Sequence, residues 1–171
     1  MKNFKKVLFV LFISLAVTAC KKDDEGGDDG QAGEGQMVAK VDGQNFQSLE
    51  GTVMAQESNS GVRTLAVSAG TVNSENLQMI IINFDGEGTY DLNFTNIGTY
   101  SFLPDPSNPD PSTVVVYSTA NGNSSNGTIN ISSYSTTNVK GTFSFTGYNI
   151  NNPSETTSVT EGSFDMALTQ N

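Results

Sequence analysis

The residues able to do chemistry in this chain are few, because its 171 residues include one cysteine, Cys20, and no histidine. A lone thiol cannot form an internal disulfide, and without imidazole or a second thiolate a structural zinc site has no ligand set. Ser-His-Asp and Cys-His nucleophilic catalysis are excluded for the same reason. Carboxylates, hydroxyls and the single thiol remain.

Two groups of carboxylates lie close enough in sequence to act together. Asp85 and Glu87 flank a glycine, and Asp105 and Asp110 lie in a proline-rich loop. A glycosidase needs two carboxyls about 5–10 Å apart across a cleft, and a calcium ion could be held by Asp105, Asp110 and loop carbonyls. The spacing matches no calcium-loop motif, and Asp85 with the next glycine also fits a turn. We predict no enzyme, no metal and no cofactor bound by these side chains.

Strands would position these side chains, because residues 37–171 have a hydrophobic period of two. Phe143 and Phe145, for example, alternate with Thr142, Ser144 and Thr146. Such alternation predicts half-buried antiparallel strands. We expect strands at residues 37–42, 44–49, 51–57, 62–70, 77–84, 88–94, 98–103, 113–119, 127–134, 139–147 and 157–169.

The expected fold is all-β, either an antiparallel β-sandwich or a flattened β-barrel of about ten strands, after a signal peptide and a disordered linker. Asp42-Gly43 and Asp85-Gly86 predict tight hairpins, and sequential hairpins favour a meander. Residues 77–82 and 114–117 are apolar without alternation, which predicts central strands. The alternative is that one face lines a lipid-binding cavity or a partner interface.

A short phrase, glycine then a small residue then an aromatic ring, recurs at strand starts, as in Gly141-Thr142-Phe143 and Gly162-Ser163-Phe164. Its spacing is irregular, so we interpret it as a shared strand feature. For glycan binding, Tyr134 and Tyr148 are the best exposed candidates, but core or edge packing is the favoured interpretation for each.

The first twenty residues have the layout of a secretory signal peptide. Lysines at positions 2, 5 and 6 precede an apolar run over residues 7–17, and small residues then precede Cys20. The run is shorter than the roughly 20 apolar residues that cross a bilayer. We therefore expect residues 1–19 to be a signal peptide.

Val17-Thr18-Ala19-Cys20 resembles the lipobox of bacterial lipoproteins, in which the cysteine is lipidated and becomes the mature N-terminus. One acyl chain anchors a protein only marginally. The resemblance implies two or three chains, and hence a durable membrane anchor. It also explains the unpaired cysteine.

The segment after Cys20 is acidic and rich in glycine. Lys22, Asp23, Asp24 and Glu25 resemble the export signal of Bacteroidota-type lipoproteins, which are carried to the outer face of the outer membrane; the other interpretation is a solvated tether. Residues 20–36 cannot bury enough apolar surface to become ordered. We expect a lipidated cysteine and a flexible arm there, and the β-domain at 37–171.

The chain is strongly acidic, with a net charge of −10 from 8 basic and 18 acidic residues. An acidic surface repels nucleic acid, whose binding depends on neutralising phosphates. We therefore expect no nucleic-acid binding. The expected partners are the membrane, through the anchor, and an unknown envelope protein or glycan.

Both ends of the domain resemble an uncharacterised family of small all-β lipoproteins. The resemblance rests on the start, Val38-Ala39-Lys40-Val41-Asp42-Gly43, and on the ending around Gly141-Thr142-Phe143 and Gly162-Ser163-Phe164. That family has no assigned activity, so the resemblance implies no catalytic or binding residues. From the export signal we expect an outer-membrane location facing the exterior, and the exclusions above favour a non-catalytic domain that binds an unknown ligand or partner. The alternatives are a carboxylate-dependent carbohydrate-active enzyme and a lipid-binding barrel.

Overall fold

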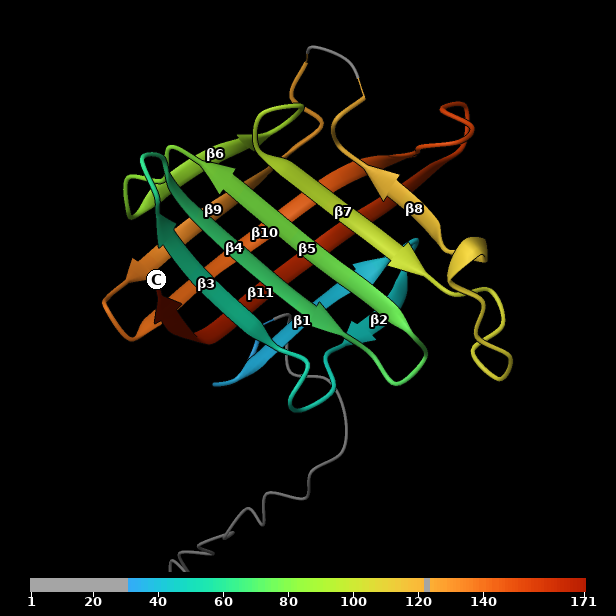
Figure 1. Cartoon of the computed structure of the whole chain (residues 1–171), viewed down its shortest axis with the longest axis horizontal. Coiled ribbons are helices and arrows are strands. Elements are labelled where there is room, and N and C mark those ends of the chain that lie inside the picture. The colour runs from blue at the N-terminus through green and yellow to red at the C-terminus, as the bar shows by residue number, and fades with distance from the viewer. Residues whose placement is uncertain (1–30, 122–123) are drawn as a thin grey trace, which may run out of the picture.

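The computed structural model describes residues 31–121 and 124–171. This part of the chain forms strands and one short 3-10 helix, arranged in two layers (Figure 1). The expected all-β class is confirmed. The elements are β1 (Gln36–Val41), β2 (Gln44–Gln47), β3 (Met54–Asn59), β4 (Arg63–Gly70), β5 (Glu75–Ile82), β6 (Gly88–Leu92), β7 (Ile97–Phe102), η1 (Pro111–Thr113), β8 (Val115–Ser118), β9 (Gly127–Tyr134), β10 (Asn138–Asn149) and β11 (Thr156–Gln170).

The strands pair in the order β2-β1-β11-β3-β4-β5-β7-β8-β10-β9-β6, and β10 also pairs with β11. A closed ring of strands is therefore formed by β11, β3, β4, β5, β7, β8 and β10. The near layer in Figure 1 contains β3, β4, β5, β7 and β8, and β9, β10 and β11 cross behind it. The fold thus combines the two layers of a sandwich with the closure of a flattened barrel.

The long strands β10 and β11 make this closure possible, because each pairs with several partners along its length. One edge of β11 pairs with β1 through Asp165 and then with β3 through residues 168–170. One edge of β10 pairs with β9 and then, at Tyr148 and Asn149, with β8. A strand that contributes to both layers forms a corner of the fold.

Three details differ from the sequence-based expectations. The β11–β3 pairing is parallel, whereas the other pairings are antiparallel. The meander is wrong, because β6 leaves β5 and pairs with β9 instead. For that reason Asp85-Gly86 is a connection and not a hairpin, while Asp42-Gly43 is the predicted tight turn, with φ of 49° and 81°.

The core lies between the layers, where the alternating side chains meet. On β5, Leu77, Met79 and Ile81 are buried, while Ile80 and Ile82 on the other face are half-buried. This strand is central, as predicted. The apolar stretch at 114–117 also forms a strand with neighbours on both sides, because β8 pairs with β7 and β10, but all four residues of β8 are only half-buried.

The second half of β11 departs from alternation, because five consecutive residues from Gly162 to Met166 are buried. The chain preceding β1 lies against this strand. The Ala32 amide donates to Ser163 Oγ at 2.6 Å, and the Gly35 amide donates to the Asp165 carbonyl at 2.8 Å. Within the described residues, contact with the domain thus includes Ala32 and Gly35, inside the stretch expected to be the linker.

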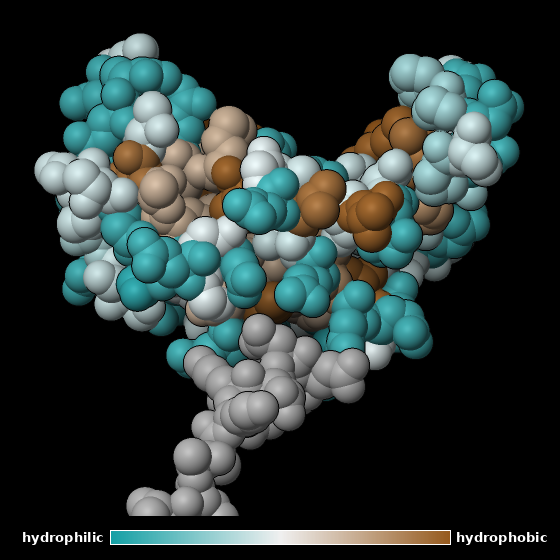
Figure 2. Space-filling model, turned by 90° about the horizontal axis from the view of Figure 1, so that it is seen from below, coloured by the Kyte–Doolittle hydropathy of each residue, from teal (hydrophilic) through white to brown (hydrophobic). Residues whose placement is uncertain are grey.

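Seen from below, hydrophilic side chains cover much of the surface, and apolar ones are interspersed among them (Figure 2). Two lobes project on either side of a hollow in this view. Within the described residues, no helix has the length and apolarity needed to span a membrane.

Candidate functional site

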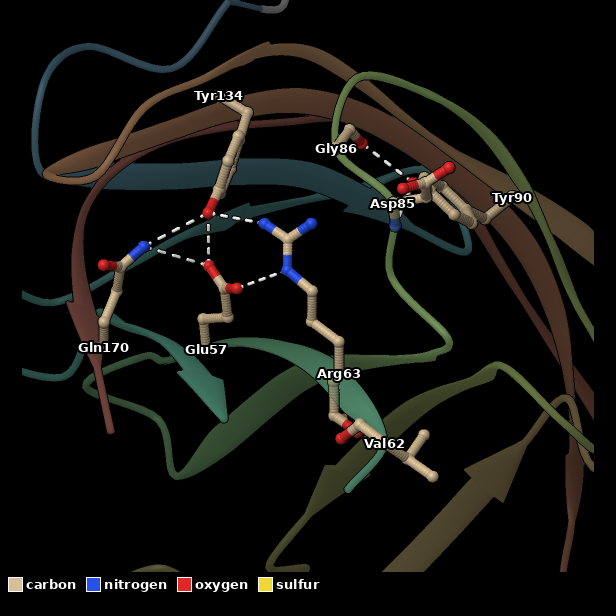
Figure 3. A network of polar contacts seen from close by, with 9 residues as sticks. Glu57, Val62, Arg63, Asp85, Gly86, Tyr90, Tyr134 and Gln170 are labelled. Atoms are coloured by element: carbon tan, nitrogen blue, oxygen red, sulfur yellow. Dashed lines mark hydrogen bonds and ion pairs between the residues drawn. The ribbon is translucent and has the colours of Figure 1, made fainter. Parts of the chain in front are cut away.

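A cluster of four polar side chains joins the two layers at one end of the fold (Figure 3). Glu57 lies on β3, Arg63 begins β4, Tyr134 ends β9 and Gln170 ends β11. They meet because the β3–β4 hairpin and the ends of β9 and β11 lie at the same end of the two layers. Arg63 is one of three basic residues in the domain.

The Glu57 carboxylate is the centre of this cluster. One oxygen accepts from Arg63 Nε at 2.5 Å, and the other accepts from the Tyr134 hydroxyl and from Gln170 Nε2, the latter at 3.1 Å. Arg63 Nη2 donates to the Tyr134 oxygen at 2.7 Å. Glu57 is 7% exposed, so its charge is balanced by these donors in place of water.

Two aromatic rings enclose the guanidinium. Arg63 Cζ lies 4.9 Å from the centre of the Phe84 ring and 5.2 Å from that of Tyr134. The two rings meet edge to face, with centroids 5.1 Å apart. Cations are attracted to ring faces at such distances. The guanidinium is therefore held both by these rings and by its hydrogen bonds to Glu57 and Tyr134.

The electrostatics of the cluster favour a structural role over proton transfer. The hydrogen bond from Arg63 holds the pKa of Glu57 below its usual value, although burial acts in the opposite direction. Burial and the bond to Glu57 raise the pKa of the Tyr134 phenol. Glu57 therefore remains ionised and Tyr134 protonated at neutral pH, whereas a general acid needs a raised carboxyl pKa.

The carboxylates considered for catalysis lie at the surface. Asp85 and Glu87 are both exposed, and the Glu87 carboxylate accepts from the Tyr134 amide at 3.1 Å. The Tyr90 hydroxyl accepts from the Asp85 amide and donates to the Gly86 carbonyl. These contacts fix the β5–β6 connection next to the Glu57 cluster.

Asp105 and Asp110, the proposed calcium loop, each cap a turn of their own. Asp105 Oδ1 accepts from the Ser107 hydroxyl at 2.7 Å, and Asp110 Oδ1 accepts from the Ser112 hydroxyl at 2.7 Å. These serine hydrogen bonds lower the pKa of both carboxyls. In the part of the chain that the structure describes, no three acidic or thiol side chains are grouped to hold a metal ion.

The tyrosines considered for glycan binding are both half-buried. Tyr134 belongs to the Glu57 cluster, and Tyr148 lies where β10 pairs with β8. Cys20 and the export-signal residues Lys22, Asp23, Asp24 and Glu25 lie outside the described residues. Sequence reasoning missed Glu57, Arg63 and Gln170 as a site; the only signal was the scarcity of basic residues in the domain.

A shallow cleft of about 310 Å³ lies at the opposite end of β4, between β2 and the turn that joins β4 to β5. Leu49 and Val72 line it and are 48% and 78% exposed. Glu75 also lines the cleft, and its carboxylate accepts from the hydroxyls of Thr71 and Tyr100. The cleft thus offers apolar contacts beside a negative charge.

The fold and these sites define an all-β domain with a closed two-layer sheet and an acidic surface cleft. The chain belongs to a family described as a domain of unknown function (DUF6252), whose model matches residues 34–166. This membership agrees with the expected uncharacterised family. Neither the curated proteins nor the solved structures contain a match.

Proposed function

We propose that the chain is a Bacteroidota-type lipoprotein of the outer membrane, anchored by lipid on Cys20 and facing the exterior. Its β-domain is a non-catalytic module that binds a protein or glycan of the cell envelope. The observation that carries this proposal is Val17-Thr18-Ala19-Cys20, placed directly after a basic start and an apolar run.

The described domain adds support for binding over catalysis. The Asp105 and Asp110 carboxylates accept hydrogen bonds within their own turns, and Glu57 is held ionised by Arg63. The space between the layers is occupied by large buried side chains, which favours a binding surface over an internal lipid cavity. Those buried to the greatest extent include Phe46, Phe164, Leu65, Leu77, Met79, Ile129 and Met166.

The anchor is tested with Cys20→Ser in the full chain. We expect the wild-type chain to incorporate labelled palmitate and to sediment with membranes, and the variant to lose the label and leave the membrane fraction. Equal labelling and equal membrane partitioning of the two chains would refute the anchor.

The exterior location is tested by protease treatment of intact cells. The chain with Asp23→Ala, Asp24→Ala and Glu25→Ala should become protected, because the acidic export signal is lost. The matched control, Asp28→Ala with Asp29→Ala, changes the same kind of charge farther along the segment and should remain accessible. Protection of the wild-type domain would contradict surface display.

A further inference from the structure

Among the described residues, no strand pairs with the outer edge of β2, so the backbone N–H and C=O groups on that edge are free to pair. The Ser48 amide donates to the Met37 carbonyl at 2.9 Å, and β1 and β2 pair in a register that places Phe46 opposite Ala39. Bonded and non-bonded pairs alternate in an antiparallel ladder. The N–H and C=O groups of Asn45 and Gln47 therefore point away from β1, and β2 is the last strand on this side of the sheet.

The cleft described above adjoins this strand. Asn45 and Gln47 line one side of it, and Val72 and Glu75 line the other. Figure 2 views this end of the molecule, where apolar side chains lie among hydrophilic ones. An exposed strand edge beside side-chain contacts is the arrangement used in β-strand addition, in which backbone bonds give affinity and neighbouring pockets give specificity.

The charge at the cleft is negative. Glu75 is one of the residues that line the cleft, and Asp42 and Glu50 lie in the segments that precede and follow β2. The nearby cation, Lys40, lies on β1 and is paired with Glu161 at 2.7 Å. An incoming segment with lysine or arginine is therefore complementary to the cleft.

We propose that the free edge of β2 and this cleft bind an extended, basic peptide segment of a partner protein, which adds to the sheet as a strand. This deepens the binding role proposed above but does not depend on the lipid anchor. The chain's own residues 23–34 are a poor occupant because they contain six acidic and no basic residues. A second copy is disfavoured by the net charge of −10.

The first test measures binding of fluorescent nonapeptides to the full chain in detergent, by anisotropy. The peptides carry lysine or arginine at alternating positions and combinations of threonine, valine and leucine between them. We expect saturable binding by members of this set, and binding at least about tenfold weaker when glutamate replaces the basic residues. No saturable binding by any member, or equal binding of the acidic set, would overturn the proposal.

The second test separates strand addition from simple charge attraction. N-methylation of the bound peptide at alternate residues blocks the donors on one of its edges. Methylation of the edge that faces β2 should weaken binding about tenfold or more, and methylation of the other edge should be tolerated. In amide exchange by NMR, the peptide should slow exchange at Asn45 and Gln47 but not at Asp85. Tolerance of both methylation patterns would exclude strand addition.

Variants then locate the side-chain contacts. Glu75→Gln should weaken binding of the lysine peptides about threefold, and Val72→Ser should weaken binding of those with leucine. Asp85→Asn and Val62→Ser, at the other end of β4, are the matched controls and should bind as the wild type does. If sedimentation shows a dimer and amide exchange shows that the β2 amides are protected in it, the edge binds a second copy and the proposal is overturned. Failure of anchoring in the Cys20→Ser experiment would leave all these results unaffected.

Discussion

Arg63 is the residue whose loss should be most informative, because it neutralises a carboxylate that water reaches poorly. Arg63→Ala leaves Glu57, 7% exposed, without its cation. Removing one partner of a buried pair costs about 3–5 kcal/mol, and the partial exposure of Arg63 places the expected loss near the lower limit, about 3 kcal/mol. Urea unfolding measures this change.

Lys40→Ala is the matched control for that experiment. Lys40 pairs with Glu161 at a similar distance, but both side chains are largely exposed, so the pair contributes less than about 1 kcal/mol. Equal destabilisation by the two substitutions would contradict the role assigned to the Glu57 cluster.

The same cluster predicts how stability depends on pH. The pKa of Glu57 is lower in the folded chain than in the unfolded one, chiefly through the hydrogen bond from Arg63. Its contribution is therefore fully present above the unfolded pKa of about 4.3 and is lost as the pH falls through the folded value. Glu57→Gln should flatten the acid limb of the stability curve, and Tyr134→Phe should do so in part. An unchanged acid limb in Glu57→Gln would contradict this assignment.

At the scale of the residue, the sequence showed which side chains were present and excluded catalysis by histidine or cysteine, but it could not predict that these four side chains meet. Glu57 and Gln170 are more than a hundred positions apart, and their contact depends on the turn of β11 from one layer to the other. Tyr134 was singled out for its ring, whereas in the structure its hydroxyl is the group that makes the contacts. Pairing across layers leaves no local pattern in the sequence.

The central element is the β10–β11 pair, in which glycines and rings interlock. Phe143 lies opposite Gly162, and Phe164 lies opposite Gly141. A Cβ on Gly162 would lie 2.5 Å from the Phe143 ring, and one on Gly141 would lie 2.7 Å from the Phe164 ring. In β10 and β11 the glycine-aromatic phrase is therefore a reciprocal packing device, more specific than the shared strand feature expected from sequence.

Gly162→Ala should destabilise the fold by about 1–3 kcal/mol, because the ring must move out of a well-packed position. Thermal unfolding measures the loss. Combination with Phe143→Leu should be less than additive, since the smaller side chain leaves room for the new methyl group. Gly33→Ala is the control, because its Cβ would meet only the flexible end of Gln36. Full additivity of Gly162→Ala with Phe143→Leu would contradict the interlocking.

Strand positions were largely predictable, since alternation is a local property; the prediction of a strand at residues 127–134 is confirmed without change. Which strands pair with one another could not be predicted in the same way. The prediction of a hairpin at Asp85-Gly86 was wrong because β6 pairs with β9, which begins only at Gly127. Turn residues specify local bends but do not determine which distant edge a strand meets.

At the scale of the whole molecule, closure of the ring depends on a few terminal residues. Residues 168–170 form the parallel pairing with β3, and the Asn171 amide donates to the Glu57 carbonyl at 2.9 Å. The buried Leu168 and the hydrogen bonds of Gln170 belong to the same short segment. The sequence identified this stretch as part of a strand, but closure arises from two long strands that change partners.

Truncation after Ala167 should therefore open the ring at β3. The chain loses the β11–β3 backbone pairing, the buried Leu168 side chain, the Gln170 donor to the Glu57 carboxylate and the Asn171 donor to the Glu57 carbonyl. The expected cost is about 3–5 kcal/mol. Truncation after Gln170 is the matched control, because it removes one backbone hydrogen bond and should cost about 1 kcal/mol. Urea unfolding gives both values, and amide exchange should accelerate on β3 only in the shorter chain. Equal stability of the two truncated chains would show that the β11–β3 pairing does not stabilise the fold. The two layers would then be held together at the β8–β10 corner, and the parallel pairing would be a consequence of closure and not its cause.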